Sequence, residues 1–365
     1  MKALISGGGT GGHIFPAISI ADELKRQIPD TEILFVGAKG KMEMEKVPAA
    51  GYEIIGLPVR GFQRRITWKN ITFFFNLIAS MIKSRNIVKR FKPDIAIGVG
   101  GYASGPVLRT AIAKNIKTLI QEQNSFAGVT NRILSKKVNK ICVAYEGMER
   151  YFPKEKIVLT GNPIRQDIQN IREKISEATS YFKINANQKT ILVLGGSLGA
   201  RSINEAIHKD YEKIINAGIQ IIWQTGKNYF QKVSKLSETV LPQGLVIKEF
   251  IKRMDYAYAI ADIIISRAGA GTISELAVVQ KPCILVPSPY VAENHQTKNA
   301  MALVKKNAAL LVEDSNTKSE LVNTAIKLIN DKIKMQVLEK NIKNFAKPDA
   351  AKTIVEEIKK LLEQK

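Results

Sequence analysis

Short apolar runs rich in β-branched residues alternate along the chain with longer stretches in which apolar residues recur at helical spacing. This alternation is typical of α/β proteins, in which helices cover both faces of a parallel sheet. The runs predict strands at residues 2–6, 32–37, 52–57, 94–99, 117–121, 140–145, 156–161, 190–196, 219–226, 244–250, 261–267, 283–289 and 308–314.

The two halves of the chain open with the same pattern. KALISGGGTGG, from residue 2, and TILVLGGSLGA, from residue 190, each combine an apolar strand, a glycine-rich loop and the start of a helix. This repetition predicts an α/β fold of two tandem Rossmann-like, doubly wound domains that face a cleft.

The boundary between the domains is expected near Gly161–Arg165, where TGNPIR precedes a polar helix predicted over residues 166–178. The predicted domains are therefore residues 1–163 and residues 164–345. Residues 346–365 have apolar positions at helical spacing with charges between them. We expect this segment to be an amphipathic helix that packs back on the domains.

The net charge of +22 calls for an anionic partner, and residues 54–93 contain no Asp or Glu. Nucleic acid, an anionic membrane surface and a phosphorylated substrate would each meet that demand. Cys142 and Cys283 lie far apart in apolar runs, which favours buried thiols over a disulfide or a metal site. The start, MKALIS, lacks the apolar stretch of a signal peptide, and no run reaches the roughly 18 apolar residues of a membrane span, so we expect a cytoplasmic protein.

Glycine-rich loops give the first chemical signal. Gly7, Gly9 and Gly12 have the spacing of a dinucleotide-binding loop, but that function needs an acidic residue at the end of the second strand, which here ends at Gly37. Three more glycine loops follow strands, at residues 98–106, 195–200 and 267–275. Backbone N–H groups at such helix starts attract phosphate, and we expect two phosphorylated substrates to face each other rather than one dinucleotide.

Eight motifs then occur in a fixed order between residues 7 and 300: GGGTGGHIFPA, GVGGYASGP, QEQNSFAGVTNRIL, TGNPIR, GGSLGARSIN, EFI, SRAGAGTISELA and AENHQTKNA. In these motifs the chain resembles the peptidoglycan glycosyltransferases of the MurG type. The resemblance implies the GT-B fold and inverting transfer of N-acetylglucosamine from UDP-N-acetylglucosamine to the C4 hydroxyl of undecaprenyl-pyrophosphoryl-N-acetylmuramoyl-pentapeptide. It also implies a peripheral enzyme at the cytoplasmic face of the bacterial cell membrane.

The same resemblance assigns the acceptor mainly to the N-terminal domain and the donor mainly to the C-terminal one. It implies a donor site of Thr10, Gly11, Gly12, Asn124, Arg165, Ser197, Ile251, Ala270, Gly271, Thr272, Ile273, Ser274, Glu275 and Gln296. The acceptor pyrophosphate is expected at Gly9, Gly100, Gly101, Tyr102 and Ser104.

Five of these donor-site residues have chemistry that suits a particular part of the donor. Ser197 fits the diphosphate, Glu275 the ribose hydroxyls, Asn124 and Gln296 the sugar hydroxyls or acetamido group, and the backbone of Ile251 the uracil. Three alternatives stay open. Glu275 also suits the first turn of a helix, Arg165 a salt bridge at the domain boundary, and Gln296 a solvent-facing loop.

Inversion in a single displacement requires a base that takes the proton of the acceptor hydroxyl. Of His13, His208 and His295, we predict His13, at the tip of the first glycine loop, with Glu122 as the alternative. His13 also suits a hydrogen bond to its own loop or to the acceptor pyrophosphate, and that alternative stays open, while His208 is expected to be exposed. No cluster with metal-ligand spacing lies near these loops, so we expect no protein-bound metal, while a divalent ion carried by substrate phosphates stays open.

Residues 66–92 combine apolar residues around most of a helix with cations and no carboxylate. Either the helix is well buried or it rests on an anionic membrane, and we predict the membrane. The patch comprises Phe73, Phe74, Phe75, Leu77, Ile78, Lys69, Lys83 and Arg85.

A diacylglycerol glycosyltransferase would share these features and is the nearest alternative function. A non-catalytic sugar-nucleotide sensor is a weaker one. Nucleic acid is not expected as a partner, because the cations do not alternate with stacking aromatic residues.

Overall fold

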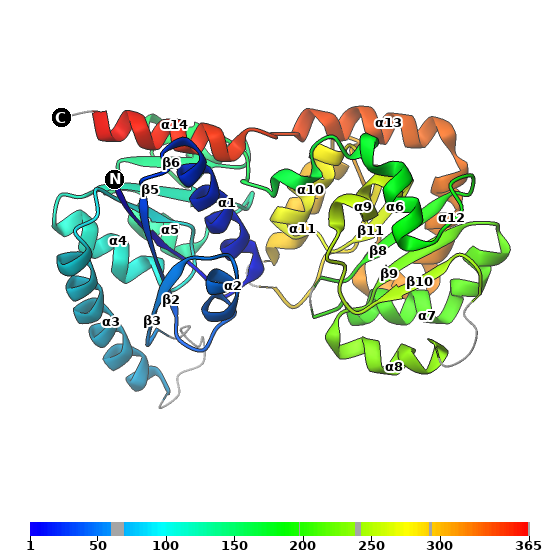
Figure 1. The fold of residues 1–365 in the computed structure, drawn as a ribbon, viewed down its shortest axis with the longest axis horizontal. Helices are drawn as coiled ribbons and strands as arrows, with labels where there is room; N and C mark the ends of the chain where they lie inside the picture. Colours follow the sequence, from blue (N-terminus) through cyan, green and yellow to red (C-terminus); the bar gives the residue numbers. More distant parts are fainter. Residues whose placement is uncertain (60–68, 197, 238–241, 292–293, 364–365) are drawn as a thin grey trace. The chain divides into compact units, whose positions relative to one another are not determined.

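The computed structural model describes residues 1–59, 69–196, 198–237, 242–291 and 294–363. The side chains of residues 69–74 and 234–237 are also outside the description. The described chain divides into two compact units, one of residues Met1–Ile164 with Lys347–Lys365 and one of residues Arg165–Ala346 (Figure 1). We refer to them as the first and the second unit.

The first unit is built on a seven-stranded parallel sheet of order β3-β2-β1-β4-β5-β6-β7. Its strands are β1 (Lys2–Ser6), β2 (Glu32–Ala38), β3 (Glu53–Leu57), β4 (Ile95–Gly98), β5 (Lys117–Glu122), β6 (Lys140–Val143) and β7 (Ile157–Leu159). Its helices are α1 (Gly11–Gln27), α2 (Glu43–Ala49), α3 (Lys69–Phe91), α4 (Ser104–Ala113), α5 (Val129–Leu134) and α14 (Ala350–Glu363).

Alternate residues of each central strand enter two different cores, one on each face of this sheet. Leu4 packs with Val36 and Ala96 on one face, whereas Ile5 packs with Phe35 on the other. The strands therefore read as continuous apolar runs, because both faces are buried. The second face is closed by α1 together with α14, whose residues Ile354, Val355, Ile358 and Leu361 are all buried there.

The second unit repeats this architecture with six parallel strands of order β10-β9-β8-β11-β12-β13. The strands are β8 (Thr190–Leu194), β9 (Gln220–Gln224), β10 (Leu245–Lys248), β11 (Ile263–Ser266), β12 (Cys283–Leu285) and β13 (Leu310–Leu311). The helices are α6 (Ile175–Phe182), α7 (Arg201–Asn216), α8 (Lys227–Ser237), α9 (Met254–Ile260), α10 (Ala270–Val279), α11 (His295–Val304), α12 (Val322–Asn330) and α13 (Lys332–Ile342).

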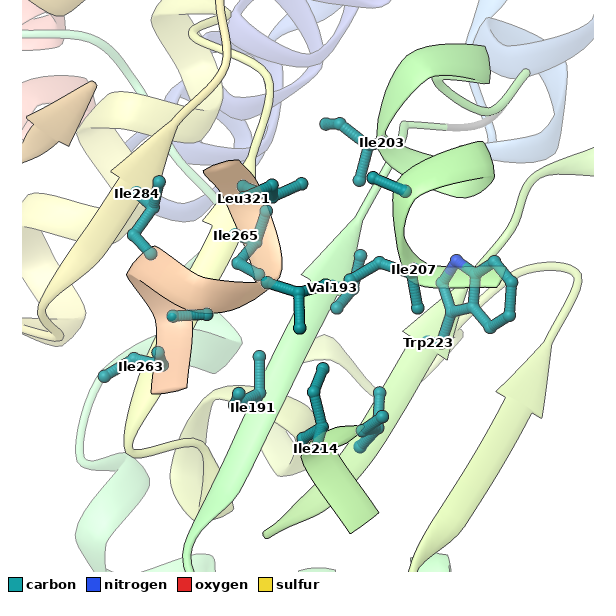
Figure 2. Close-up of a cluster of buried hydrophobic side chains, with 14 of the residues drawn as sticks. Ile191, Val193, Ile203, Ile207, Ile214, Trp223, Ile263, Ile265, Ile284 and Leu321 are labelled. Carbon is teal, nitrogen blue, oxygen red and sulfur yellow. The ribbon is translucent and has the colours of Figure 1, made fainter. Parts of the chain in front are cut away.

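Figure 2 shows the core on one face of this second sheet, where isoleucines of β8 and β11 pack against side chains of α7. Trp223 is fully buried at its edge and donates its indole N–H to the Asn204 side-chain oxygen at 2.9 Å. The α/β fold and each strand predicted from the hydrophobic pattern are confirmed in both units.

The helix predicted over residues 166–178 is wrong in its first half. Residues Gln166–Ile168 and Ile171–Lys174 form two short 3-10 turns, and the α-helix begins only at Ile175. Asn170, between the turns, has a φ of 55°, a left-handed conformation that asparagine tolerates and that interrupts a helix.

Among the described residues, no helix is both long and apolar enough to cross a membrane.

Candidate functional site

Two glycine loops lie side by side at the carboxyl edge of the first sheet. One joins β1 to α1 and the other joins β4 to α4, and β1 and β4 are adjacent strands. From β1 the strand order proceeds toward one edge of the sheet, and from β4 it proceeds toward the other edge. Open parallel sheets bind ligands at such a reversal point, beyond the carboxyl ends of the strands. A Cβ on Gly101 would lie 2.4 Å from the carbonyl oxygen of Gly8, so the two backbones touch and tolerate no side chain there.

The second sheet has the same arrangement. Its glycine loops follow β8 and β11, which are again the adjacent strands at the reversal point. Among the described residues, and apart from chain neighbours and the nearby backbone of their own helix, no atoms lie within 4 Å of where a Cβ on Gly196, with a φ of 78°, or on Gly271 would be. Both turns therefore leave open space beside their backbone. Ser197, predicted to contact the diphosphate, lies outside the described residues.

His13 is the third residue of α1 and bridges the two glycine loops of the first unit. Its Nδ1 lies 3.2 Å from the hydroxyl oxygen of Thr10, and its backbone N–H donates to the Thr10 carbonyl at 3.1 Å. Its Nε2 lies 2.9 Å from where a Cβ on Gly100 would be, and Gly100 has a φ of 89°. Gly100 must therefore be glycine both for its backbone and for the imidazole that covers it.

The remaining residues predicted for the acceptor pyrophosphate lie on these same loops. Gly9 and Tyr102 are exposed, whereas the buried Ser104 donates its hydroxyl to the Gly101 carbonyl at 3.0 Å. Ser104 thus tightens the loop that follows β4. Of the donor residues assigned to this unit, Thr10 and Gly12 are exposed and Gly11 is half-buried, all at the start of α1.

Glu122, the alternative base, is held by four hydrogen bonds at the end of β5. One oxygen accepts from the backbone and side-chain nitrogens of Asn124, and the other from the Gly128 N–H and the Asn131 amide, at 2.9–3.3 Å. Burial raises the pKa of this carboxyl, and the four donors oppose that rise. These donors occupy the lone pairs of both oxygens, so Glu122 anchors Asn124, Gly128 and Asn131 around the end of β5.

Glu275 and Arg165 form an ion pair within the second unit. Arg165 Nε donates to one Glu275 oxygen at 3.1 Å, and the buried Tyr258 hydroxyl donates to the other at 2.8 Å. Arg165 therefore does form a salt bridge, as the alternative interpretation proposed. Its partner, Glu275, is itself one of the residues predicted for the donor site. Helix α10 begins at Ala270, so Glu275 lies in its second turn, and its placement in the first turn was wrong.

The rest of the predicted donor run builds the start of α10. Gly269 precedes the helix, the side chains of Ala270 and Ile273 are buried, and Ser274 donates its hydroxyl to the Ala270 carbonyl at 3.0 Å. Gly271 and Thr272 are half-buried. The first N–H groups of α10 have no partner within the helix, as at every helix start, and they make this turn a candidate anion site.

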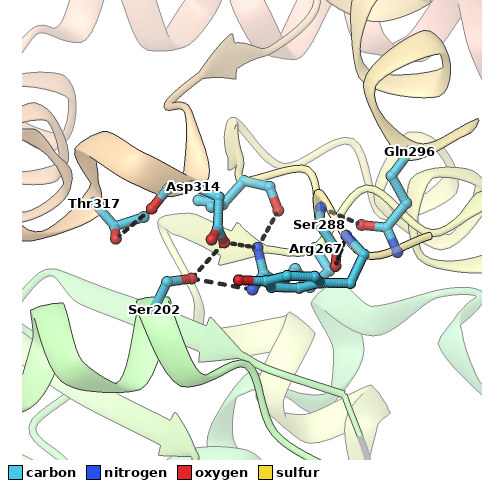
Figure 3. Close-up of polar contacts among 8 residues, drawn as sticks. Ser202, Arg267, Ser288, Gln296, Asp314 and Thr317 are labelled. Carbon is cyan, nitrogen blue, oxygen red and sulfur yellow. Dashed lines mark hydrogen bonds and ion pairs between the residues drawn. The ribbon is translucent and has the colours of Figure 1, made fainter. Parts of the chain in front are cut away.

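A polar network that the sequence did not reveal ties the loops of the second sheet together (Figure 3). Arg267, just after β11, donates to an oxygen of Asp314, to the Ser202 hydroxyl at 3.0 Å and to the Val286 carbonyl at 3.1 Å. It thereby joins the start of α7 to the ends of β12 and β13. Contacts that span 47 to 65 residues carry no local sequence signal.

Gln296 and Ile251 are both fixed by hydrogen bonds to neighbouring loops. The Gln296 side-chain oxygen accepts from the Ser288 N–H at 2.8 Å, as Figure 3 shows, so this amide is not a free solvent-facing group. The Ile251 N–H donates to the Gln224 side-chain oxygen at 2.8 Å. Only the carbonyl of Ile251 is then left for the predicted backbone contact with uracil.

Neither cysteine lies in this candidate site. Cys142 and Cys283 are buried free thiols, as predicted, and burial raises the pKa of Cys283 to about 12. Among the residues that the structure describes, no group of three or more His, Cys, Asp and Glu side chains is arranged to hold a metal ion.

Two doubly wound parallel sheets, each with glycine turns where its connections reverse, are the architecture of the GT-B class, to which the structural neighbours of this chain belong. The model of the glycosyltransferase family 28 N-terminal domain matches residues 3–143, and that of the C-terminal domain matches residues 190–354. The chain belongs to this family, and it is a glycosyltransferase.

Relatives named UDP-N-acetylglucosamine--N-acetylmuramyl-(pentapeptide) pyrophosphoryl-undecaprenol N-acetylglucosamine transferase match at full length. The one from Flavobacterium psychrophilum is 56% identical over 99% of this chain and 98% of its own. The one from Parabacteroides distasonis is 53% identical over 100% and 99%. The crystal structure of Acinetobacter baumannii MurG is 27% identical, with a TM-score of 0.77 over 98% of this chain and 99% of that one.

Proposed function

We propose that this chain transfers N-acetylglucosamine from UDP-N-acetylglucosamine to the C4 hydroxyl of undecaprenyl-pyrophosphoryl-N-acetylmuramoyl-pentapeptide. The observation that carries the proposal is the full-length similarity to relatives named for this reaction, at 56% and 53% identity. The matches cover 98% and 99% of those relatives, so both of their domains have counterparts here.

The geometry supplies groups for both halves of the reaction. Inversion needs a base at the acceptor hydroxyl and positive groups at the departing diphosphate. His13 is the half-buried imidazole beside two glycine turns of the first unit. The open turns before α7 and α10 offer backbone N–H groups to a diphosphate, and Glu275 suits the ribose hydroxyls.

Turnover assays with two acceptors test this proposal. We expect UDP release from UDP-N-acetylglucosamine with the lipid-linked muramoyl-pentapeptide, much slower release with UDP-glucose, and none with diacylglycerol. Transfer to diacylglycerol alone would instead support the alternative glycosyltransferase. Binding of UDP without turnover on either acceptor would support a non-catalytic sensor.

We propose further that α3 rests on the anionic cytoplasmic surface of the membrane. Phe75, Ile78 and Ile82 are 57–70% exposed, and Leu77 is 37% exposed, so these described side chains are not those of a fully buried helix. Arg85 and Lys89 continue the helical stripe of positions 75, 78 and 82 and are also exposed. One stripe therefore passes from apolar to basic, which suits lipid headgroups at roughly 1 kcal/mol per nearby cation.

Other members of the predicted patch are placed differently. Lys69, Phe73 and Phe74 belong to α3, but their side chains lie outside the described part of the chain. Lys83 donates to the Gly56 carbonyl at 2.8 Å, which ties α3 to β3. The ammonium group of Lys83 therefore also stabilises the packing of α3 on β3.

Co-sedimentation with vesicles tests the membrane proposal. The chain should pellet with anionic vesicles at low salt and much less with neutral ones. An Ile78→Asp, Ile82→Asp variant should bind at least about 30-fold more weakly, because half-burying each isoleucine contributes roughly 1 kcal/mol and the two together roughly 2 kcal/mol. Ile333→Asp, at a 77% exposed isoleucine of the second unit, is the matched control and should bind normally. Equal pelleting with anionic and neutral vesicles would contradict the proposal.

A further inference from the structure

We infer that Glu43 is a positioning residue that holds the first glycine loop, and with it His13, in a working geometry. Glu43 is the first residue of α2 and its side chain is almost completely buried, at 1% exposure. The inference rests on the proposed function for its effect on catalysis, but not for the effect on the loop itself.

The Glu43 carboxylate joins two loops at the carboxyl edge of the first sheet. One oxygen accepts from the Ala38 N–H at 2.9 Å, at the end of β2, and the other accepts from the Gly9 N–H at 3.0 Å. Charge-assisted bonds to backbone amides are about twice as strong as neutral ones. The carboxylate therefore ties the exposed tip of the glycine loop to the neighbouring strand.

Two glycines leave the space that this carboxylate occupies. A Cβ on Gly8 would lie 2.1 Å from a Glu43 oxygen, and a Cβ on Gly37 would lie 2.5 Å from the Glu43 Cγ. Any side chain at either position would displace the carboxylate. Gly8, which lies between the glycines of the dinucleotide-like spacing, and Gly37 at the end of β2 thus admit an acidic side chain of the protein itself.

The contact at Gly9 leads directly to His13. Thr10, the next residue, accepts the backbone N–H of His13 at its carbonyl, and its hydroxyl meets His13 Nδ1 at 3.2 Å. A shift of Gly9 would therefore move both groups that orient the imidazole. Glu43 acts on the reaction through His13, without contacting the substrate.

The Glu43→Gln variant tests this role, because glutamine keeps the shape but presents an NH₂ group to one of the two backbone donors. Hydrogen exchange of the segment at residues 7–14 should rise about tenfold or more. kcat should fall about tenfold, while the affinity for UDP, whose proposed site lies mainly in the second unit, stays within twofold. In a His13→Ala background the same substitution should change kcat by less than twofold, since coupled residues are not additive.

Glu23→Gln is the matched control. Glu23 is a buried carboxylate of the same unit, at 7% exposure, and binds Arg26 and Gln27 on its own helix. It should lose stability without changing exchange at residues 7–14 or kcat. If Glu43→Gln does not fold, Glu43→Asp replaces it in the same measurements. Its side chain is too short to reach both amides, so we expect the same rise in exchange and the same fall in kcat.

Unchanged exchange at residues 7–14, the same changes in the Glu23→Gln control, or full additivity with His13→Ala would overturn the inference. A wild-type chain that fails to use the muramoyl acceptor would refute the proposed function instead. The exchange measurement needs no substrate and would still decide the role of Glu43.

Discussion

Replacing His13 with alanine is expected to lower kcat by about 100-fold or more, the usual contribution of a general base. For this role Nδ1–H must donate to the Thr10 hydroxyl oxygen, 3.2 Å away, so that Nε2 keeps a lone pair for the proton of the acceptor. Steady-state kinetics with both substrates varied, together with calorimetric titration of UDP, measure the effect. UDP affinity should not change.

Two comparisons separate this role from its alternative. If His13 only binds the acceptor pyrophosphate, the substitution will raise the acceptor KM and leave kcat nearly intact. His208→Ala is the control, because His208 is a half-buried imidazole in the second unit, 3.1 Å from the Tyr229 hydroxyl, rather than the exposed residue expected from the sequence. It should lower the melting temperature with little effect on kcat.

The fold was largely predictable, because strands that are buried on both faces of a sheet appear in the sequence as continuous apolar runs. β1 and β8 are such runs, and each leads into a glycine loop at the point where its sheet reverses. Local signals of this kind need no knowledge of distant contacts. Asn170 shows their limit, since one residue in a left-handed conformation ended a pattern that otherwise predicted a helix.

The positions of the glycine loops could be predicted from the sequence, but the side-chain contacts that hold these loops could not. Glu43, five residues after Ala38 at the end of β2, accepts from the Gly9 N–H across 34 residues of chain. The packing of His13 on Gly100 likewise depends on β1 and β4 being neighbours, which no local pattern states. Sequence therefore locates the backbone that can bind phosphate, while the side chains that hold that backbone in place are set by strand order.

Replacing Glu275 with glutamine is expected to weaken UDP binding about 10- to 100-fold. Arg165 and Tyr258 donate to different oxygens of this carboxylate, which leaves each oxygen a further lone pair for a ribose hydroxyl. A hydrogen bond to a charged group contributes about 1.5–3 kcal/mol, which corresponds to that loss in affinity. Calorimetric titration with UDP measures it without any acceptor.

The pH dependence of UDP binding provides a second measure of the same carboxylate. Burial raises the pKa of Glu275, although the Arg165 charge opposes this, so its ionised form is lost on acidification at a higher pH than for an ordinary glutamate. Because the ionised form is the better acceptor for ribose, UDP affinity should fall early as pH decreases. Glu275→Gln should remove that dependence.

A matched control distinguishes ligand binding from a purely structural pair. Glu205 also pairs with an arginine, Arg201, at 2.6 Å, and its side chain has the same 18% exposure as that of Glu275. Glu205→Gln should leave UDP affinity within twofold. If Glu275→Gln lowers only stability and UDP binds as before, then Glu275 serves only its contacts with Arg165 and Tyr258, and the ribose hydroxyls bind another group.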